Sequence, residues 1–292
     1  MVETEAPASD DRAYAIRFLR VRTPAWETMV TTFSMFTSLS LQRFLEVAHQ
    51  PDSLWFFLHI PKTAGSSMST ELGRVRPPYL NISIDYVQDA RQHDAALAKT
   101  LSGISPSTLK AARSASGHVP AKFLQPITQA VPDVRLFTIL RDPVQRVLSD
   151  YVYQTTPAHP PFEDFKRRYP HVEDYVLDAS EQDKMFFFAS GERSTRDFDA
   201  SYKEITNRFC FIGLTELYDM SFNIVTRLMG SGALPSEFRR QTSAEAKARV
   251  QVTPALTALI RQTNPLDQQL YERVAGALLP KLQAWQTLQA AG

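Results

Sequence analysis

The sequence predicts an α/β domain with a central, mainly parallel β-sheet flanked by helices and a helical C-terminal part. Three short apolar runs, at 54–60, 134–140 and 209–213, have the length and aromatic content of buried strands. A segment with helical spacing of apolar residues follows each run, and strands that alternate with helices favour a parallel sheet. The C-terminal ranges expected to be helical are 244–250, 254–262 and 265–289.

The chain of 292 residues, 43% of them apolar, is long enough to bury a sizeable core. We expect residues 1–50 to form an acidic lead-in and a helix, and residues 51–292 to form a single domain. The helix is expected over 29–42 and its neighbourhood. Its apolar residues on or near one face are Met29, Phe33, Phe36 and Phe44.

Charge and cysteine content exclude several functional classes. The 32 basic and 31 acidic residues leave a net charge of +1, so no global field attracts nucleic acid or an anionic membrane. The single Cys210 excludes an intramolecular disulfide framework and a cysteine-rich zinc site. The N-terminus lacks the order of a signal peptide, and 29–42 is shorter than the roughly 18 apolar residues of a transmembrane helix. These features together favour a cytoplasmic protein without a transmembrane segment.

The first strand-loop-helix unit comprises the strand at 54–60, the loop 61–67 and a helix expected to end near Gly73. Ser66 or Ser67 is expected to cap the helix. The loop brings a glycine, two hydroxyls and a lysine to the helix N-terminus. Backbone N–H groups, the helix dipole and a cation together suit a phosphate-like anion.

The second unit is the strand at 134–140 with the residues that follow it. Asp142 is expected to cap a helix that has Pro143 in its first turn. Arg141 and Ser149 are then candidates for a second anion site near the strand end. The residues alone leave an alternative open, in which Arg141 pairs with a nearby carboxylate and Ser149 is an ordinary helix residue.

Between the two units, the sequence is less informative. A short strand is expected at 81–87, weakly helical structure at 89–115, and a turn at 117–120 that presents His118. Histidine is the commonest acid-base group, although a lone histidine is more often structural. Beyond the second unit, we expect a polar loop at 191–201.

The loop at 61–67 differs from a Walker A sequence, because its lysine precedes the glycine by three positions. This disfavours ATP hydrolysis. The blocks HIPKTAGSS at 59–67 and LRDPVQRVLSDY at 140–151 resemble those of sulfotransferases that use 3′-phosphoadenosine 5′-phosphosulfate (PAPS), closest to the carbohydrate type of the Golgi and of bacteria. Softer similarity extends to 211–230 and 264–274.

The resemblance implies a P-loop-like fold and a role for each matched residue. The residues that would hold the 5′-phosphosulfate are Lys62, Thr63, Ala64, Gly65, Ser66 and Ser67. Arg141 and Ser149 would hold the 3′-phosphate, and Lys62 would stabilise the leaving oxygen. His118, whose setting resembles the catalytic histidine of uronyl-type members, would be the base, and the competing candidates are His59, Glu71 and Asp94. No metal is expected.

The implied reaction is transfer of a sulfuryl group from PAPS to a hydroxyl of a carbohydrate, glycolipid or small molecule. The segments at 76–116 and 155–205 are expected to line the acceptor site, because binding residues concentrate on loops. No nucleic-acid partner is expected. Three alternatives stay open: a nucleotide-binding protein without transfer activity, a P-loop-type phosphotransferase, and a scaffold without nucleotide affinity.

Overall fold

The computed structural model describes residues 31–83, 90–159, 161–236 and 250–291, which belong to one compact unit, Thr31–Gly292. Its centre is a five-stranded sheet in the order β2-β3-β1-β4-β5, and every pairing is parallel. The strands are β1 (Trp55–Leu58), β2 (Tyr79–Ile82), β3 (Ser114–Gly117), β4 (Arg135–Leu140) and β5 (Phe211–Leu214). The predicted α/β, P-loop-like architecture is confirmed.

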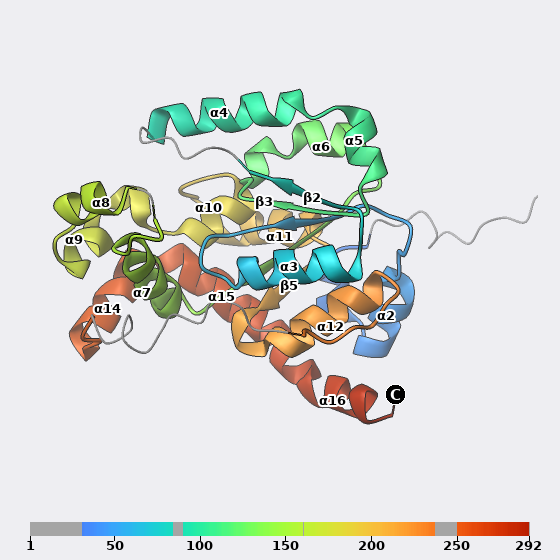
Figure 1. Ribbon diagram of the computed structural model, residues 1–292. Helices are drawn as coiled ribbons and strands as arrows, with labels where there is room; N and C mark the ends of the chain where they lie inside the picture. The colour runs from blue at the N-terminus through green and yellow to red at the C-terminus, as the bar shows by residue number, and fades with distance from the viewer. Residues whose placement is uncertain (1–30, 84–89, 160, 237–249, 292) are drawn as a thin grey trace, which may run out of the picture. The chain divides into compact units, whose positions relative to one another are not determined.

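Helices cover both faces of the sheet. They are α1 (Phe33–Ser38), α2 (Leu41–Ala48), α3 (Gly65–Val75), α4 (Ala90–Gly103), α5 (Pro106–Ala111), α6 (Gln125–Ala130), α7 (Pro143–Gln154), α8 (Phe162–Arg168), α9 (Val172–Leu177), α10 (Lys184–Ser190), α11 (Phe198–Arg208), α12 (Tyr218–Leu228), α14 (Pro254–Thr263), α15 (Pro265–Leu278) and α16 (Leu282–Ala290). In Figure 1, α3 and α12 run along one side of the sheet, and α4, α5 and α6 lie on the other. None of the helices in the described ranges combines the length and apolarity needed to cross a membrane.

The chain leaves β1 and β4 in opposite directions. The connection through α3 leads from β1 to the edge strand β2, whereas the connection from β4 leads to the other edge strand, β5. Open parallel sheets bind ligands at the carboxyl ends of their strands, where the direction of winding reverses. The loop after β1 and the start of α7 therefore meet at the expected binding position.

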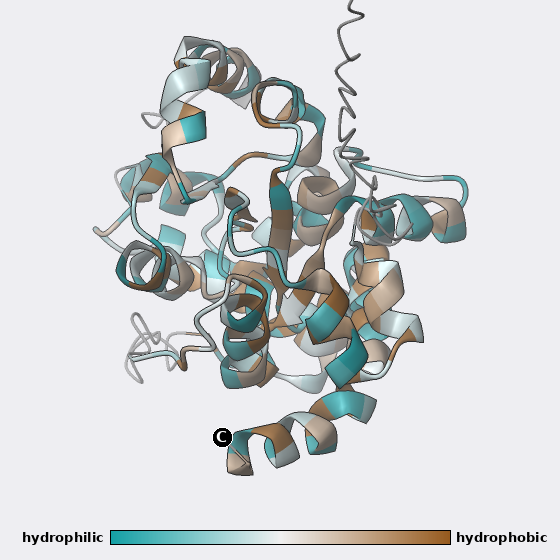
Figure 2. Ribbon diagram, turned by 90° about the vertical axis from the view of Figure 1, so that its right-hand side faces the viewer, coloured by the Kyte–Doolittle hydropathy of each residue, from teal (hydrophilic) through white to brown (hydrophobic). Residues whose placement is uncertain are grey.

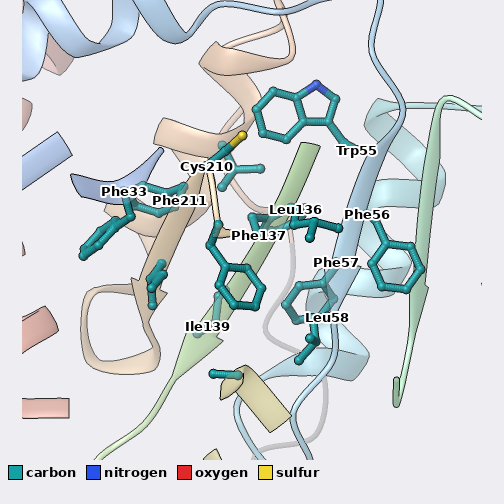
Figure 3. Packing of buried hydrophobic residues seen from close by; sticks show 14 of the residues in the cluster. Phe33, Trp55, Phe56, Phe57, Leu58, Leu136, Phe137, Ile139, Cys210 and Phe211 are labelled. Atoms are coloured by element: carbon teal, nitrogen blue, oxygen red, sulfur yellow. The ribbon is translucent and has the colours of Figure 1, made fainter. Parts of the chain in front are cut away.

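The main core is formed by aromatic residues of the central strands. All four residues of β1 are fully buried. The ring centroid of Phe137 on β4 lies 5.1 Å from that of Phe57 and 6.2 Å from that of Trp55. Figure 3 shows these three rings on the neighbouring strands β1 and β4. Figure 2 shows the same pattern, with hydrophobic strands inside and polar residues on the outer turns of the helices. The core fixes the strand from which the first candidate loop leaves.

A second core lies among α7, α8, α9 and α14. Its buried members are Val144, Val147, Leu148, Tyr151, Phe165, Tyr169, Val172, Tyr175, Val176, Leu256 and Ile260. Val144, Val147, Leu148 and Tyr151, which recur at helical spacing in the sequence, belong to this cluster. One face of α7 is thereby fixed, while Gln145 and Ser149 lie on another stripe of the helix.

One strand of the sheet was not predicted. The sequence predicts weakly helical structure up to residue 115 and a turn from Gly117, but Ser114–Gly117 form β3, between β2 and β1. The sequence SASG lacks the β-branched residues that mark strands. Its residues are small because neighbours approach closely, and a Cβ on Gly117 would lie 2.7 Å from the carbonyl oxygen of Ile82.

Several other boundaries also differ. The N-terminal helix is two short helices, because the chain is extended at Leu39 and Ser40 and Ser40 caps α2 by accepting from the Arg43 N–H at 3.2 Å. The predicted loop at 191–201 already contains the start of α11, which Asp197 caps. Met29, part of the strand expected at 81–87 and most of the helix expected at 244–250 lie outside the described residues.

Two aspartates cap each other's helices at the junction of α10 and α15. The Asp183 Oδ1 accepts from the backbone N–H groups of Leu266 and Asp267, both at 2.9 Å. The Asp267 carboxylate accepts from the N–H groups of Met185 and Phe186 at 3.2 and 2.7 Å. Both side chains are buried. Burial, and then repulsion from Asp267, raises the pKa of Asp183 to about 6.

We predict that Asp183→Asn stabilises the protein at neutral pH. An exposed aspartate has a pKa of about 3.9, so between that value and 6 the folded protein binds more protons than the unfolded chain, and stability falls as the pH rises. Asparagine keeps the capping oxygen and removes the buried charge. Urea unfolding should show a gain of about 2 kcal/mol near pH 8 that shrinks towards zero near pH 4.

The matched control is Asp197→Asn, at the exposed cap of α11. It should change the free energy of unfolding by less than about 0.5 kcal/mol at either pH. A gain for Asp183→Asn that is independent of pH would contradict the assignment of the raised pKa to this group.

Candidate active site

The loop after β1 has an unusual backbone. Lys62 and Ala64 adopt left-handed conformations with φ of 69° and 63°, and the buried Thr63 hydroxyl between them donates to the Ile60 carbonyl at 3.0 Å. Such conformations are costly for residues other than glycine and tend to occur at functional sites. The backbone thus turns sharply and presents its N–H groups at the carboxyl edge of the sheet.

The helix after this loop begins two or three residues earlier than predicted. Ala64 is the N-cap of α3, and the Met68 N–H makes the first intrahelical bond, to the Ala64 carbonyl at 3.1 Å. The expectation that Ser66 or Ser67 caps the helix is therefore wrong, because the left-handed Ala64 turns the chain into the helix first. The N–H groups of Gly65, Ser66 and Ser67 precede that bond and point towards the loop.

Gly65 leaves room for a histidine ring. A Cβ on Gly65 would lie 1.6 Å from Nε2 of His59. The His59 ring also stacks on Phe57, with 5.5 Å between centroids. Because the ring occupies the place of the missing side chain, the loop and the end of β1 pack as one unit.

His118 lies beside this unit, directly after β3. Its ring centroid is 3.9 Å from that of His59, and its Nδ1 lies 2.8 Å from the His59 carbonyl oxygen. A carbonyl only accepts, so Nδ1 carries the proton in this hydrogen bond and Nε2 of the neutral ring is left with its lone pair. Solvent reaches the His118 ring, although protein surrounds it on most sides. The arrangement suits a proton acceptor.

The surroundings of His59 and His118 favour the neutral form of both imidazole rings. Burial lowers the pKa of His59 well below 6.5, and the neighbouring His118 and Lys62 lower it further. Burial also lowers the pKa of His118, and Lys62 and His93 add to this, while the hydrogen bond to His59 and the charge of Asp150 oppose it. His118 is therefore able to accept a proton at neutral pH.

Arg141 connects the two predicted anion sites. Its Nη1 donates to the Lys62 carbonyl at 3.2 Å. Burial lowers the pKa of Arg141, but an arginine with a lowered pKa is still charged at neutral pH. The charges of Glu216 and Asp142 oppose this lowering, so carboxylates lie in the neighbourhood of Arg141, although no ion pair between Arg141 and a carboxylate is found among the described residues.

A pocket of about 240 Å³ opens next to Arg141. Its lining residues are Arg141, Gln145, Leu148, Ser149, Val152, Val250 and Val252. The structure thus brings together Arg141 and Ser149, the two residues predicted to hold a 3′-phosphate, in one cavity. Its apolar lining is a feature that the sequence analysis did not identify.

Lys62, the other predicted cation, lies over an aromatic ring. Its Nζ is 3.9 Å from the ring centroid of Tyr153 on α7, a cation–π contact. Tyr153 is not among the site residues predicted from the sequence. The spacing of Ser149 and Tyr153, one helical turn apart, is the signal that could have placed both on one face of the helix.

The other candidates for the base are engaged elsewhere. Glu71 accepts from Arg74 at 2.6 Å and from the Ser236 hydroxyl at 2.6 Å, on the second turn of α3. Asp94 forms an ion pair with Lys122 at 2.6 Å. Within the described ranges, no group of three or more His, Cys, Asp or Glu side chains is arranged to hold a metal ion.

A larger pocket, of about 720 Å³, lies elsewhere. It is open to solvent between α2, the end of α12 and α16, and residues such as His49, Arg227 and Gly230 line it. The strand ends contribute none of its lining residues. The smaller pocket next to Arg141 is therefore the one that belongs to the candidate active site.

Comparisons with known proteins give matches at the level of structure. No protein-family model and no curated protein matches the chain. A solved sulfotransferase from Alicyclobacillus acidocaldarius is similar with 13% identity and a TM-score of 0.36, over 81% of this chain and 99% of that one. Mouse sulfotransferase SULT7A1 complexed with PAP is similar with 14% identity and a TM-score of 0.40, over 82% and 95% of the two chains. At these values the likeness does not establish a family, and the function has to be argued from the geometry of the site.

We predict that Gly65→Ala disturbs the site through His59. The new methyl group would occupy the position of the His59 ring, which is held between Phe57 and His118 and must move. Overpacking of this kind costs about 1–3 kcal/mol. Thermal unfolding should show a lower Tm, and His59→Ala in the same background should recover part of the loss.

Gly73→Ala is the matched control on the same helix. Its Cβ would make an ordinary contact of 3.7 Å with Tyr79. Because alanine favours helices over glycine by about 1 kcal/mol, this variant should be as stable as the parent protein or more so. Equal effects of the two substitutions would mean that the His59 ring does not depend on Gly65.

Proposed function

We propose that the protein transfers a sulfuryl group from PAPS to a hydroxyl of a carbohydrate, glycolipid or small-molecule acceptor. The proposal rests on one observation, which is that the cationic residues that follow two strands, Lys62 after β1 and Arg141 after β4, lie close together. The Lys62 loop and the pocket of Arg141 and Ser149 lie at one edge of the sheet and are joined by the bond from Arg141 to the Lys62 carbonyl. PAPS has two anionic ends and needs two such sites.

The polar and apolar groups of the candidate site match the chemical groups of PAPS. The N–H groups of Gly65, Ser66 and Ser67, at the positive end of α3, suit the 5′-phosphosulfate. Arg141 and Ser149 suit the 3′-phosphate, because a guanidinium and a hydroxyl both donate to phosphate oxygens. The apolar part of the same pocket, with Leu148 and Val152, suits a nucleoside.

PAPS supplies an activated sulfuryl group with adenosine 3′,5′-bisphosphate as the leaving group. In the transfer, the acceptor oxygen forms a bond to sulfur, the bond between sulfur and the bridging oxygen breaks, and the acceptor proton leaves. The Lys62 ammonium stabilises the negative charge that develops on the bridging oxygen. His118 takes the acceptor proton on Nε2, while its Nδ1–H stays bonded to the His59 carbonyl.

Two other functions are less well supported. A P-loop-type phosphotransferase needs a lysine that follows the glycine loop and acidic residues that hold magnesium. Here the lysine precedes the glycine by three positions. A nucleotide-binding protein without transfer activity has no need of a neutral histidine whose tautomer is fixed beside the anion loop.

The experiment that tests the proposal measures sulfate transfer from labelled PAPS to a panel of glycans, glycolipids and small hydroxyl compounds. We predict that two variants fail in different ways. Lys62→Ala should lower turnover by at least about a hundredfold, a larger loss than the one it causes in the affinity for adenosine 3′,5′-bisphosphate. Arg141→Ala should weaken that affinity by at least about tenfold, because a charge-assisted bond to the 3′-phosphate is lost.

Calorimetric titration with adenosine 3′,5′-bisphosphate and with the 5′-monophosphate supplies the control. The parent protein should prefer the bisphosphate, and Arg141→Ala should lose most of this preference. Tight binding without transfer to any acceptor would favour the nucleotide-binding alternative, and no binding at all would favour a scaffold.

We predict a specific pH dependence for His118. The base acts in its deprotonated form, and burial lowers its pKa below 6.5. The rate of transfer should therefore rise with pH in the acidic range, with its midpoint below pH 6.5, and become level at higher pH. His118→Ala should lower turnover by about a hundredfold or more and remove the acidic limb, while bisphosphate affinity stays the same. An unchanged rate would exclude His118 as the base.

A further inference from the structure

The contact between Lys62 and Tyr153 is not required by the fold. Lys62 lies on the loop after β1 and Tyr153 lies near the end of α7, 91 positions later in the sequence. The ammonium is 3.9 Å from the ring centroid, well within the roughly 6 Å of an effective cation–π contact. The contact therefore fixes the end of a side chain that has many rotamers.

The Tyr153 ring is itself held in place. Its hydroxyl donates to the Ala158 carbonyl at 3.2 Å, and its centroid lies 5.7 Å from that of the buried His159. Burial lowers the pKa of His159, and Lys184 and Lys62 lower it further although Asp150 opposes them. The neutral His159 does not compete with the ammonium for the face of the ring.

The same helix also fixes the backbone of Lys62. Arg141, two residues before α7, donates to the Lys62 carbonyl, so main chain and side chain are both held by the segment from Arg141 to Tyr153. Ser149, one turn before Tyr153, lines the pocket proposed for the 3′-phosphate. A donor bound at Ser149 would thus be placed in a fixed relation to the Lys62 ammonium.

We propose that Tyr153 is a positioning residue that holds the Lys62 ammonium for its role at the leaving oxygen. The proposal rests on the proposed function and adds a residue to that site. A cation that is held in place before the reaction does not have to be ordered as the transition state forms. Preorganised sites accelerate reactions in this way. The face of the Tyr153 ring makes the contact with the ammonium, and the Tyr153 hydroxyl contributes less to positioning it.

The test compares Tyr153→Phe with Tyr153→Leu. In sulfate transfer from PAPS, the leucine variant should lose about five- to thirtyfold in kcat, and its KM for PAPS should change less than about threefold. The phenylalanine variant should stay within about twofold of the parent protein, because it keeps the ring. In a Lys62→Ala background, Tyr153→Leu should add less than about twofold.

A second measurement does not depend on transfer. The rate at which Lys62 is acetylated in the apo protein, measured by mass spectrometry, reports how strongly the ammonium form of Lys62 is stabilised. The leucine variant should react about three- to thirtyfold faster at Lys62 than the parent protein, and the phenylalanine variant should not. Phe123→Leu is the control, since it removes a cation–π contact of another lysine, Lys122, outside the proposed donor and acceptor sites. This variant should match the parent in both assays.

Three results would overturn the proposal: equal impairment of the phenylalanine and leucine variants, no effect of Tyr153→Leu in either assay, or a rise in its kcat. If the parent protein transfers no sulfuryl group to any acceptor, the proposed function fails and positioning for transfer fails with it. Acetylation then still decides whether Tyr153 holds Lys62, so the two failures are distinguishable.

Discussion

The parallel pairing of β1 with β3 on one side and β4 on the other determines where every candidate residue lies. Leu58 pairs with Gly117 and with Thr138, so the residues that follow the three strands meet at one edge. His59 and His118 are the next pair in that register. The pairing of β1 with β3 therefore brings the His118 ring within hydrogen-bond distance of the His59 carbonyl.

Buried charges fix α7, the helix on which the second half of the site depends. The fully buried Arg146 forms an ion pair with Asp150 at 3.2 Å, and Lys184 and Tyr175 reach the same carboxylate at 3.1 and 2.8 Å. Burial opposes the ionisation of Asp150, but Lys184 and Arg146 outweigh it and lower its pKa. Removing one member of such a network typically costs about 3–5 kcal/mol, so the helix is held against rotation as well as displacement.

The strand and helix starts that carry both candidate anion-binding segments could be predicted from the sequence because their signals are local. The aromatic run at β1 and the Asp142-Pro143 start of α7 are sufficient by themselves, and Asp142 does accept from the Gln145 N–H at 2.9 Å. The third element could not be predicted, since β3 has small residues whose hydroxyls are satisfied by distant partners. Ser116, for example, is bonded to Ser69 and Tyr79. The partner of Lys62 was missed for the same reason, because Tyr153 is close to the loop only in the folded chain.

The location of His118 at the end of a strand, and not on a free loop, has a consequence for how such a protein can diversify. The strand β3 is fully buried, and its glycine packs against the Ile82 backbone with no space to spare. The residue proposed as proton acceptor is thus part of the rigid frame, while the connections on either side of it lie outside the sheet. Under the proposed function, insertions or exchanges in those connections can alter which hydroxyl is offered to His118 without moving His118 itself. One frame could in this way serve acceptors of quite different size.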